Sequence, residues 1–164
     1  MSGIEIRAAA PGDVPVLLRL IRALADYEKL LDQVVATEDA IAAALFGQPR
    51  YAEALLARCD GEAVGFALFF HNYSTFLGRP GLYLEDLFVV PEARGRGIGR
   101  ALFAQVARIA VERDCGRLEW AVLDWNQPAI EFYRRLGAQA LDQWTLNRLT
   151  GAPLRALADD SRSR

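Results

Sequence analysis

The stretch RGRGIGRALF, residues 94–103, sets glycine and arginine in alternation before an apolar run. Its glycines occupy every second position: Gly95, Gly97 and Gly99. This spacing matches neither the G-x-G-x-x-G of dinucleotide-binding folds nor a P-loop, because no Gly-Lys-Ser/Thr sequence closes it. Backbone N–H groups without Cβ cover at the start of a helix form a concave donor site that suits a pyrophosphate. The spacing alone leaves open a second interpretation, a tight strand-to-helix turn with solvated arginines.

Hydrophobic periodicity on both sides of this stretch predicts alternating strands and helices. Strands are expected over residues 4–9, 51–58, 62–73, 81–90, 117–124 and 138–149. Helices are expected after Asp13, between Thr37 and Gly47, over residues 98–114 and over residues 126–137. Asp60-Gly61 is a strong hairpin signal, so the strands that flank it should be antiparallel. The order predicts one α/β domain over residues 1–158 with a mixed sheet, followed by a flexible polar tail at residues 159–164.

Composition and charge narrow the class of protein. With 164 residues, 52% of them apolar, the chain can bury one core, and its net charge of −2 gives no global field for nucleic acid. Cys59, Cys115 and the single His71 lack the spacing of a metal site. No basic and apolar leader opens the sequence, and no apolar run reaches about 18 residues. We therefore expect a soluble cytoplasmic protein without a metal, nucleic-acid or membrane partner.

Longer segments around the loop resemble a known family. Residues 89–102, VVPEARGRGIGRAL, resemble the acetyl-CoA signature of the GNAT acetyltransferases, with Arg94, Gly97 and Gly99 at its fixed positions. Three segments are similar to the diamine (spermidine/spermine) N-acetyltransferase branch, including its thialysine-acetylating relatives: LADYEKL, GLYLEDLFVVPEARGRGIG and WNQPAIEFYRRLGA. The resemblance implies a GNAT fold, with a mixed sheet of about six or seven strands, about four helices, and splayed parallel strands that hold acetyl-CoA.

The resemblance also implies which residues bind the cofactor. Strand backbone would pair with the pantetheine arm, the loop would hold the phosphates, and the next helix would lie along the arm. The expected cofactor-binding residues are Leu87, Phe88, Val89, Arg94, Gly95, Arg96, Gly97, Ile98, Gly99, Arg100, Asn126, Ala129 and Tyr133. Asn126 is a good N-cap for that helix, and the sequence leaves open whether it also bonds the cofactor.

Two adjacent acids interrupt the apolar pattern of residues 81–90. Strict alternation places Tyr83, Glu85, Leu87 and Val89 on one face and Leu82, Leu84, Asp86, Phe88 and Val90 on the other. Each face then carries one carboxylate, which must be paired, hydrogen-bonded or protonated where it is buried. A raised pKa suits a general base, and the resemblance assigns that role to Glu85 at the substrate amine. A structural ion pair is the alternative for both acids.

Tyr133 is the candidate general acid. It shares a helix face with Asn126, and a phenol with a pKa near 10 is matched to protonating a departing thiolate. By pattern alone, a tyrosine on a helix is more often a half-buried packing residue. The resemblance favours the catalytic role, because the matching tyrosine of the family protonates the coenzyme A thiolate.

The resemblance places acidic and aromatic residues around the acceptor amine. The expected substrate-binding residues are Tyr27, Glu28, Glu85, Asp86, Glu119, Trp120, Asp142 and Trp144. Carboxylates would bind the charge of a cationic amine and accept its proton. Glu28 is equally consistent with a solvated helix residue paired with Lys29. The segment before Trp144 is shorter and less acidic than in the animal polyamine enzymes, which puts spermidine itself in doubt.

The resulting expectation is an acetyl-CoA-dependent N-acetyltransferase that acts on the primary amine of a polyamine, diamine or thialysine-like molecule by direct attack, without an acyl-enzyme. The alternatives are a peptide or protein N-acetyltransferase and a non-catalytic acetyl-CoA sensor. The branch also implies a homodimer, with the C-terminal strand near the partner.

Overall fold

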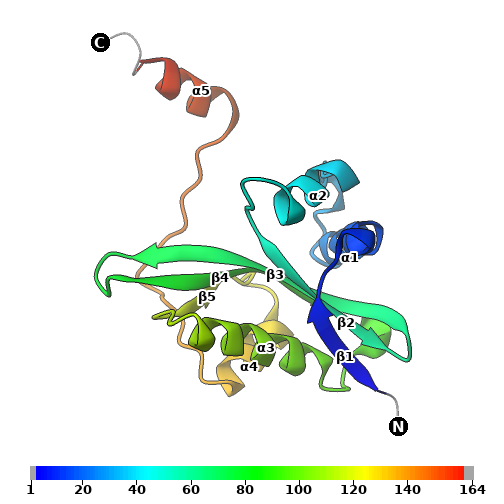
Figure 1. Ribbon diagram of the computed structural model, residues 1–164. Helices are drawn as coiled ribbons and strands as arrows, with labels where there is room; N and C mark the ends of the chain where they lie inside the picture. The colour runs from blue at the N-terminus through cyan, green and yellow to red at the C-terminus, as the bar shows by residue number, and fades with distance from the viewer. Residues whose placement is uncertain (1–2, 161–164) are drawn as a thin grey trace. The chain divides into compact units, whose positions relative to one another are not determined.

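The computed structural model describes residues 3–160. The chain divides into two compact units, residues 1–121 and residues 122–164, and each is described by itself. Unit 1 is built on a five-stranded sheet with the order β1-β2-β3-β4-β5. Its strands are β1 (Ile4–Ala8), β2 (Glu53–Cys59), β3 (Glu62–Ser74), β4 (Arg79–Val89) and β5 (Leu118–Trp120). Neighbouring strands from β1 to β4 are antiparallel and β4 pairs with β5 in parallel, which confirms the mixed sheet (Figure 1).

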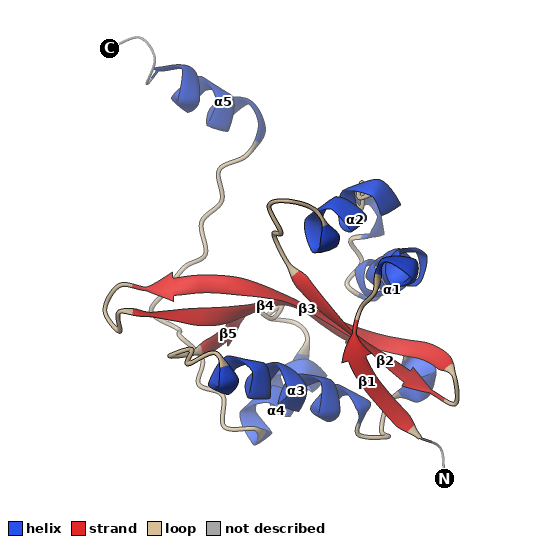
Figure 2. Cartoon of the chain, viewed as in Figure 1, coloured by secondary structure: helices blue, strands red, loops and turns tan. Residues whose placement is uncertain are grey.

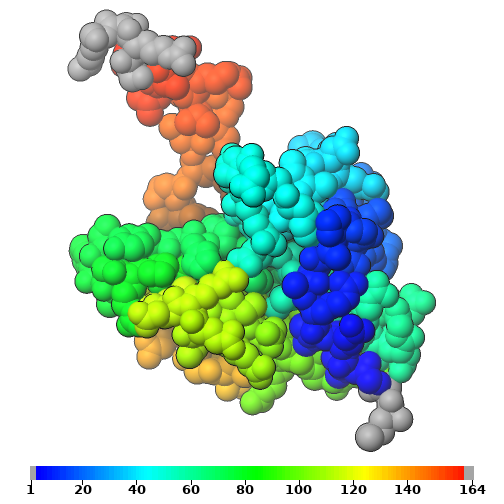
Figure 3. All heavy atoms as spheres, in the orientation of Figure 1, coloured from blue at the N-terminus to red at the C-terminus, as the bar shows by residue number. Residues whose placement is uncertain are grey.

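Helices cover both faces of this sheet. On one face α1 (Val14–Tyr27) and α2 (Glu38–Phe46) pack against an apolar cluster that includes Leu20, Phe66 and Phe88 (Figure 2). On the other face α3 (Ile98–Glu112) packs against a second cluster that includes Leu84 and Leu102. The surfaces of β1, α1 and α2, drawn blue to cyan, adjoin one another in Figure 3. The sheet is therefore the middle layer of unit 1, as the alternating strand and helix order predicts.

The predicted helix cap and hairpin turn are confirmed, because their hydrogen-bond partners lie within a few residues in the sequence. The Thr37 hydroxyl accepts a hydrogen bond from the Ala40 N–H at 3.2 Å, and α2 ends at Gly47. Asp60 and Gly61 have φ values of 53° and 84°, the two positive values that a type I′ hairpin turn needs. Short 3-10 turns cover Pro11–Asp13, Leu31–Gln33 and Pro91–Ala93.

Unit 2 departs from the expected pattern. It contains α4 (Gln127–Arg135) and α5 (Gly151–Asp160), and no strand between residues 122 and 160. The strand expected over residues 138–149 is wrong, and β5 has three residues where eight were expected at 117–124. A period-two pattern forms a strand only where a neighbouring strand pairs with its backbone, and residues 139–150 are exposed without one in their unit.

The ends of the chain bear on two further expectations. The described part has five α-helices instead of about four, because α5 was not expected. Asp159 and Asp160 end α5, so this part of the expected tail is helical, and residues 161–164 lie outside the described residues. In the described part of the chain no helix is both long and apolar enough to span a bilayer.

Candidate active site

A β-bulge at Glu85 organises the centre of unit 1. Leu68 of β3 pairs with Asp86 and Phe69 pairs with Leu84, which leaves Glu85 as an extra residue in β4. An extra residue reverses the alternation of the strand that follows it. Leu84 accordingly lies in the core below α3, whereas Phe88 lies in the core below α1 and α2. The expectation that these two residues share one face is therefore wrong.

The bulge gives the two acids different surroundings. Glu85 is exposed, so the expected burial of its carboxylate in an apolar face is wrong, whereas Asp86 is half-buried. Burial raises the pKa of Asp86 to about 7, and the negative charges of Glu85 and Glu28 add to this increase. The carboxyl group of Asp86 thus changes its protonation near neutral pH.

The end of α1 supplies the third acid of this cluster. Lys29 adopts a left-handed φ of 61°, and the Leu30 N–H donates to the Ala25 carbonyl at 2.8 Å, which closes the helix. This end places Glu28 against the sheet, where burial raises the pKa of its carboxyl group. Glu28 is therefore half-buried beside Asp86, which differs from a solvated helix residue.

Arg94 connects this cluster to the glycine-arginine loop. Its guanidinium lies 4.5 Å from the centroid of the Tyr27 ring and 5.6 Å from that of the Phe88 ring. Its Nε donates to the Val89 carbonyl at 2.9 Å. The structure therefore brings together the last turn of α1, the end of β4 and the start of the loop.

The loop has the backbone geometry expected of an anion site. Gly95 and Gly97 have φ values of 76° and 80°, which residues with a Cβ rarely adopt, and Gly97 is the N-cap of α3. The first-turn N–H groups of a helix, here from Ile98 to Arg100, have no partner within their own helix. Arg96 lies 3.7 Å from Asp60 in an exposed ion pair, and its side chain remains accessible.

The pairing of β4 and β5 ends where the bulge begins. The parallel ladder runs from Leu82 with Leu118 to Leu84 with Trp120, and β4 continues to Val89 without β5. The backbone of Leu87, Phe88 and Val89 therefore lies beyond the last pair of this ladder. Within unit 1, the parallel pairing therefore stops where the family resemblance implies that the two strands splay apart.

Glu119 and Trp120 point to opposite faces of the sheet, so they do not line one pocket within unit 1. Glu119 accepts a hydrogen bond from the Asn72 side-chain amide at 3.2 Å and pairs with Arg117 at 2.8 Å. Trp120 instead packs edge-on against Phe103 of α3, with ring centroids 5.0 Å apart. Glu119 lies beside Tyr83, whose pKa is raised by burial and by the charges of Glu85 and Glu119.

The remaining expected residues belong to unit 2. The side-chain Oδ1 of Asn126 accepts a hydrogen bond from the Ala129 N–H at 3.4 Å, which confirms Asn126 as the N-cap of α4. Tyr133 lies in α4, with its ring edge-on to Phe132 at 5.1 Å between centroids. Asp142 and Trp144 are exposed in the segment after α4.

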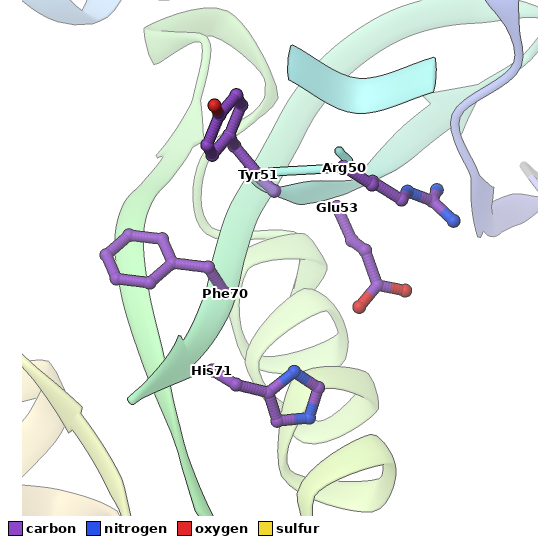
Figure 4. Close-up of a pocket in the computed structure, with 6 residues that line it drawn as sticks. Arg50, Tyr51, Glu53, Phe70 and His71 are labelled. Carbon is purple, nitrogen blue, oxygen red and sulfur yellow. The ribbon is translucent and has the colours of Figure 1, made fainter. Parts of the chain in front are cut away.

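Sequence reasoning missed a pocket where β2 begins. It has a volume of about 370 Å³ and is lined by Arg50, Tyr51, Ala52, Glu53, Phe70 and His71 (Figure 4). The Phe70 ring stacks on Tyr83 with centroids 5.3 Å apart. Alternation in β3 could have placed Phe70 beside the acids, but the register with β4 was needed to show it.

Within residues 3–160, no three His, Cys, Asp or Glu side chains are placed to hold a metal ion.

Comparison with known proteins agrees with this architecture. The chain belongs to the acetyltransferase (GNAT) family, whose pattern it matches over residues 19–138, and it is an acetyltransferase. It is 43% identical to the thialysine N-epsilon-acetyltransferase of Bos taurus, over 96% of this chain and 99% of that protein. It is 34% identical to an L-ornithine N5-acetyltransferase of Arabidopsis thaliana, over 93% of this chain and 87% of that protein.

Solved structures share the fold as well. An integron cassette protein from the mobile metagenome of V. cholerae superposes with a TM-score of 0.80 and 28% sequence identity, covering 94% of this chain and 97% of its own. The family expectation from the sequence is therefore confirmed, with a sheet of five strands instead of six or seven.

Proposed function

We propose that this protein uses acetyl-CoA to acetylate the primary amine of a small cationic molecule. One observation carries the proposal: the partly buried Asp86, with its pKa raised to about 7 by burial and by the charges of Glu85 and Glu28, lies on the strand that leads into the glycine-arginine loop. A cationic amine must lose a proton before it attacks a thioester. A carboxylate with a pKa near 7 can accept that proton, and its acidic neighbours can bind the remaining positive charge.

The loop supports the coenzyme A half of the proposal. The left-handed Gly95 and Gly97 leave the backbone open, and the first-turn N–H groups of α3 face the same end of the helix. Arg96 and Arg100 are exposed cations beside these donors. In this proposal they bind the phosphates, and the backbone of β4 from Leu87 to Val89 pairs with the pantetheine arm.

The proposed chemistry transfers the acetyl group directly. Asp86 takes one proton of the cationic amine, and the neutral nitrogen attacks the acetyl carbonyl carbon to form a tetrahedral intermediate. When the carbon–sulfur bond breaks, the nitrogen loses its second proton to the phenolate that Tyr133 becomes. Tyr133 gives a proton to the departing thiolate, as the family resemblance implies, and Asn126 and Ala129 lie along the coenzyme arm. This assignment moves the base from Glu85, which is exposed, to Asp86. Burial raises the pKa of Cys115, which disfavours the thiolate that a covalent acyl-enzyme would need.

The acceptor class is proposed from the acids and from the relatives. Glu28, Glu85 and Asp86 of unit 1, with Glu119 beside Tyr83, favour a small cation. Two relatives carry names that refer to thialysine and L-ornithine, both amino acids with a side-chain amine. In the same proposal Tyr27, Asp142 and Trp144 complete the acceptor site, whereas Trp120 packs on the other face of the sheet.

A screen of acetyl-CoA consumption tests this proposal. The purified protein is offered polyamines, diamines, thialysine, ornithine, lysine and short peptides, and release of free thiol is measured. Acetylation of small cationic amines well above that of peptides would support the proposal. Preferential acetylation of peptides would favour the protein acetyltransferase alternative, and acetyl-CoA binding without turnover on any amine would favour the sensor.

We also propose a single cytoplasmic domain, formed by both units, that assembles as a homodimer. The family match over residues 19–138 runs across both units, which supports one domain. The segment after α4 exposes Trp144, Leu146 and Leu149, apolar side chains of the kind that interfaces between subunits cover. Sedimentation equilibrium would give a mass twice that of the 18.1 kDa chain if this is correct.

A further inference from the structure

The face of the sheet that carries Asp86 extends across Tyr83 to β5. Asp86 lies opposite Leu68 and Tyr83 lies opposite Phe70. Leu68 and Phe70 are two residues apart in β3, so they and their partners project from the same face. Tyr83 is also paired with Glu119 of β5. The carboxyl groups of Asp86 and Glu119 therefore lie on one face of the sheet.

Arg117 brings a positive charge to this face. It precedes Glu119 by two residues in the chain, and its Nε lies 2.8 Å from Oε1 of Glu119. Its Nη2 donates to the Tyr73 carbonyl at 3.5 Å. The side-chain amide of Asn72 donates to the same oxygen of Glu119 at 3.2 Å. Glu119 is thus held by two neighbours, and the arginine offsets its negative charge.

A glycine of β4 makes room for this arrangement. Gly81 is buried and lies opposite Asn72. A Cβ at this position would lie 2.4 Å from Oδ1 of Asn72 and 3.0 Å from Cγ of Arg117. Any larger residue would therefore displace both groups that hold Glu119. The side chains of Arg117 and Glu119 remain 36% and 30% exposed, so the packed pair is still accessible from solvent.

The distance from Asp86 to Glu119 relates this pair to the acceptor. Asp86 and Tyr83 are two rows of β3 apart, about 7 Å, and neighbouring strands are about 4.8 Å apart, so the diagonal from Asp86 to Glu119 is about 8 Å. Each bond of an extended chain advances about 1.2 Å, so two nitrogens separated by seven bonds span about 8 Å as well. A second ammonium group at that distance from the acetylated amine would meet Arg117 beside Glu119.

We propose that Arg117 is a specificity-determining residue, which limits how far a second ammonium group can lie from the amine that is acetylated. An unpaired carboxylate at Glu119 would attract that group, whereas the pair with Arg117 has no net charge and presents a cation. A shorter acceptor keeps its second charge near Glu85 and Asp86, away from this pair. The inference rests on the proposed function and adds a length limit to it.

Diamines and amino alcohols of equal length test this limit. The alcohol replaces the second amine without a charge, so the ratio of kcat/KM for the diamine to kcat/KM for the amino alcohol measures the effect of that charge. In the wild type this ratio should be above one for 1,3-diaminopropane with 3-amino-1-propanol. It should be one or less for 1,6-diaminohexane with 6-amino-1-hexanol.

Removing the arginine should release the limit. Arg117→Met should raise the six-carbon ratio about 10-fold, because a partly buried carboxylate then contacts the distant ammonium group, and should leave the three-carbon ratio within about twofold. Adding Glu119→Gln to Arg117→Met should cancel the gain, because no carboxylate remains there. Arg79→Met is the matched control, since Arg79 pairs with the exposed Asp114, and it should change neither ratio.

The two proposals fail in different ways. If the wild type acetylates neither the diamines nor the amino alcohols, the proposed function is wrong. If the wild type already prefers 1,6-diaminohexane to its amino alcohol, the length limit is wrong and the proposed function stands, and this readout needs no substitution. The limit is also wrong if Arg117→Met leaves the six-carbon ratio unchanged or raises both ratios equally. Each ratio compares two acceptors on the same variant, so a general loss of activity does not obscure it.

Discussion

At the residue scale, the functional difference between two neighbouring carboxylates depends on one unpaired position. Glu85 is the bulged residue and is exposed, whereas Asp86 returns to the β3 register opposite Leu68 and is half-buried. Both are acids in a strand, and both carry a negative charge when ionised. The environment of Asp86 raises its pKa into the range where a base is useful, because burial and two nearby acids disfavour its charged form.

Replacing each acid in turn distinguishes their roles. In the wild type, activity should rise with pH through about 7, because only the ionised Asp86 accepts a proton. Asp86→Asn should lower kcat by about 10²- to 10⁴-fold and abolish this limb of the pH–rate profile. Glu85→Gln should keep the limb and raise KM for the amine. If Glu85→Gln instead abolishes this limb of the pH–rate profile and Asp86→Asn retains it, Glu85 is the general base.

Asp86→Asn should lower activity but increase the stability of the fold above neutral pH. The pKa of Asp86 is about 7 in the folded state and 3.8 as its ordinary value, so its contribution to stability is greatest below pH 3.8 and is lost as pH rises to about 7. Asp86→Asn should therefore increase the free energy of unfolding at pH 8 by an amount on the order of 2 kcal/mol. Chemical denaturation at pH 8 and pH 4 measures this. A destabilised Asp86→Asn variant at pH 8 would show that the carboxylate is stabilised by a partner instead.

Tyr133→Phe isolates the proposed proton donor, because it removes one hydroxyl and keeps the ring that lies edge-on to Phe132. We expect kcat to fall by about 10²- to 10⁴-fold while acetyl-CoA still binds. The loss should be smaller for acetyl donors with a more acidic leaving thiol, which need less protonation. Normal turnover with acetyl-CoA and the best amine would make Tyr133 a packing residue.

At the scale of elements, the connection from β4 to α3 brings the proposed anion site close to the proposed base. β4 ends at Val89 and α3 begins at Ile98, and the loop between them includes two left-handed glycines. Arg94 is held by the Val89 carbonyl and by the ring of Tyr27, so its role includes joining α1 to this loop. Arg96 and Arg100 have no such packing role and are the better test of phosphate binding.

Charge reversal at these two positions should weaken phosphate-dependent binding. Arg96→Glu with Arg100→Glu is expected to weaken acetyl-CoA by about 10- to 100-fold, because two charge-assisted contacts become repulsive. Acetyl-pantetheine, which lacks the nucleotide phosphates, should be affected by less than about threefold. Titration calorimetry with both donors measures the difference. Equal losses for the two donors would place the phosphates elsewhere.

At the scale of the whole molecule, a small net charge conceals strong local charges in unit 1. The net charge is −2, yet an acidic cluster and a positive loop both occur on one sheet and its connections. A partly buried ion pair also connects the first strand of the sheet to the turn that follows it. Asp13 is 6% exposed, and its carboxylate accepts hydrogen bonds from Arg7 at 2.6 and 2.9 Å and from the Ala10 N–H at 2.8 Å.

This ion pair predicts how the fold responds to acid. The Arg7 hydrogen bond lowers the pKa of Asp13 from 3.8 to about 2, so its stabilisation is present above pH 3.8 and is lost as pH falls to about 2. Asp13→Asn should destabilise the protein by about 2 kcal/mol at pH 7 and by much less at pH 2. Glu5→Gln, whose exposed carboxylate lies 3.9 Å from Arg7, is the control and should change stability by less than about 0.5 kcal/mol. A destabilisation by Asp13→Asn that does not depend on pH would contradict this account.

Features that depend on neighbours in the sequence could be predicted from the sequence alone. The Thr37 and Asn126 caps, the Asp60-Gly61 turn and the start of a helix directly after Gly97 need only their own segments. The alternation of strands and helices, and the family itself, followed from the same local patterns. These predictions were confirmed because the partners of each hydrogen bond lie a few residues apart.

Tertiary structure decided the features whose partners are distant in the sequence. The bulge at Glu85 exists only in the register with β3, and it determines which acid is buried. Residues 138–149 alternate like a strand but have no strand beside them in their unit, and the packing of Trp120 against Phe103 of α3 needed the tertiary structure. The pocket of Arg50 joins the segment before β2 to the middle of β3. A one-residue shift in pairing reverses every side chain after it, and only the neighbouring strand specifies that shift.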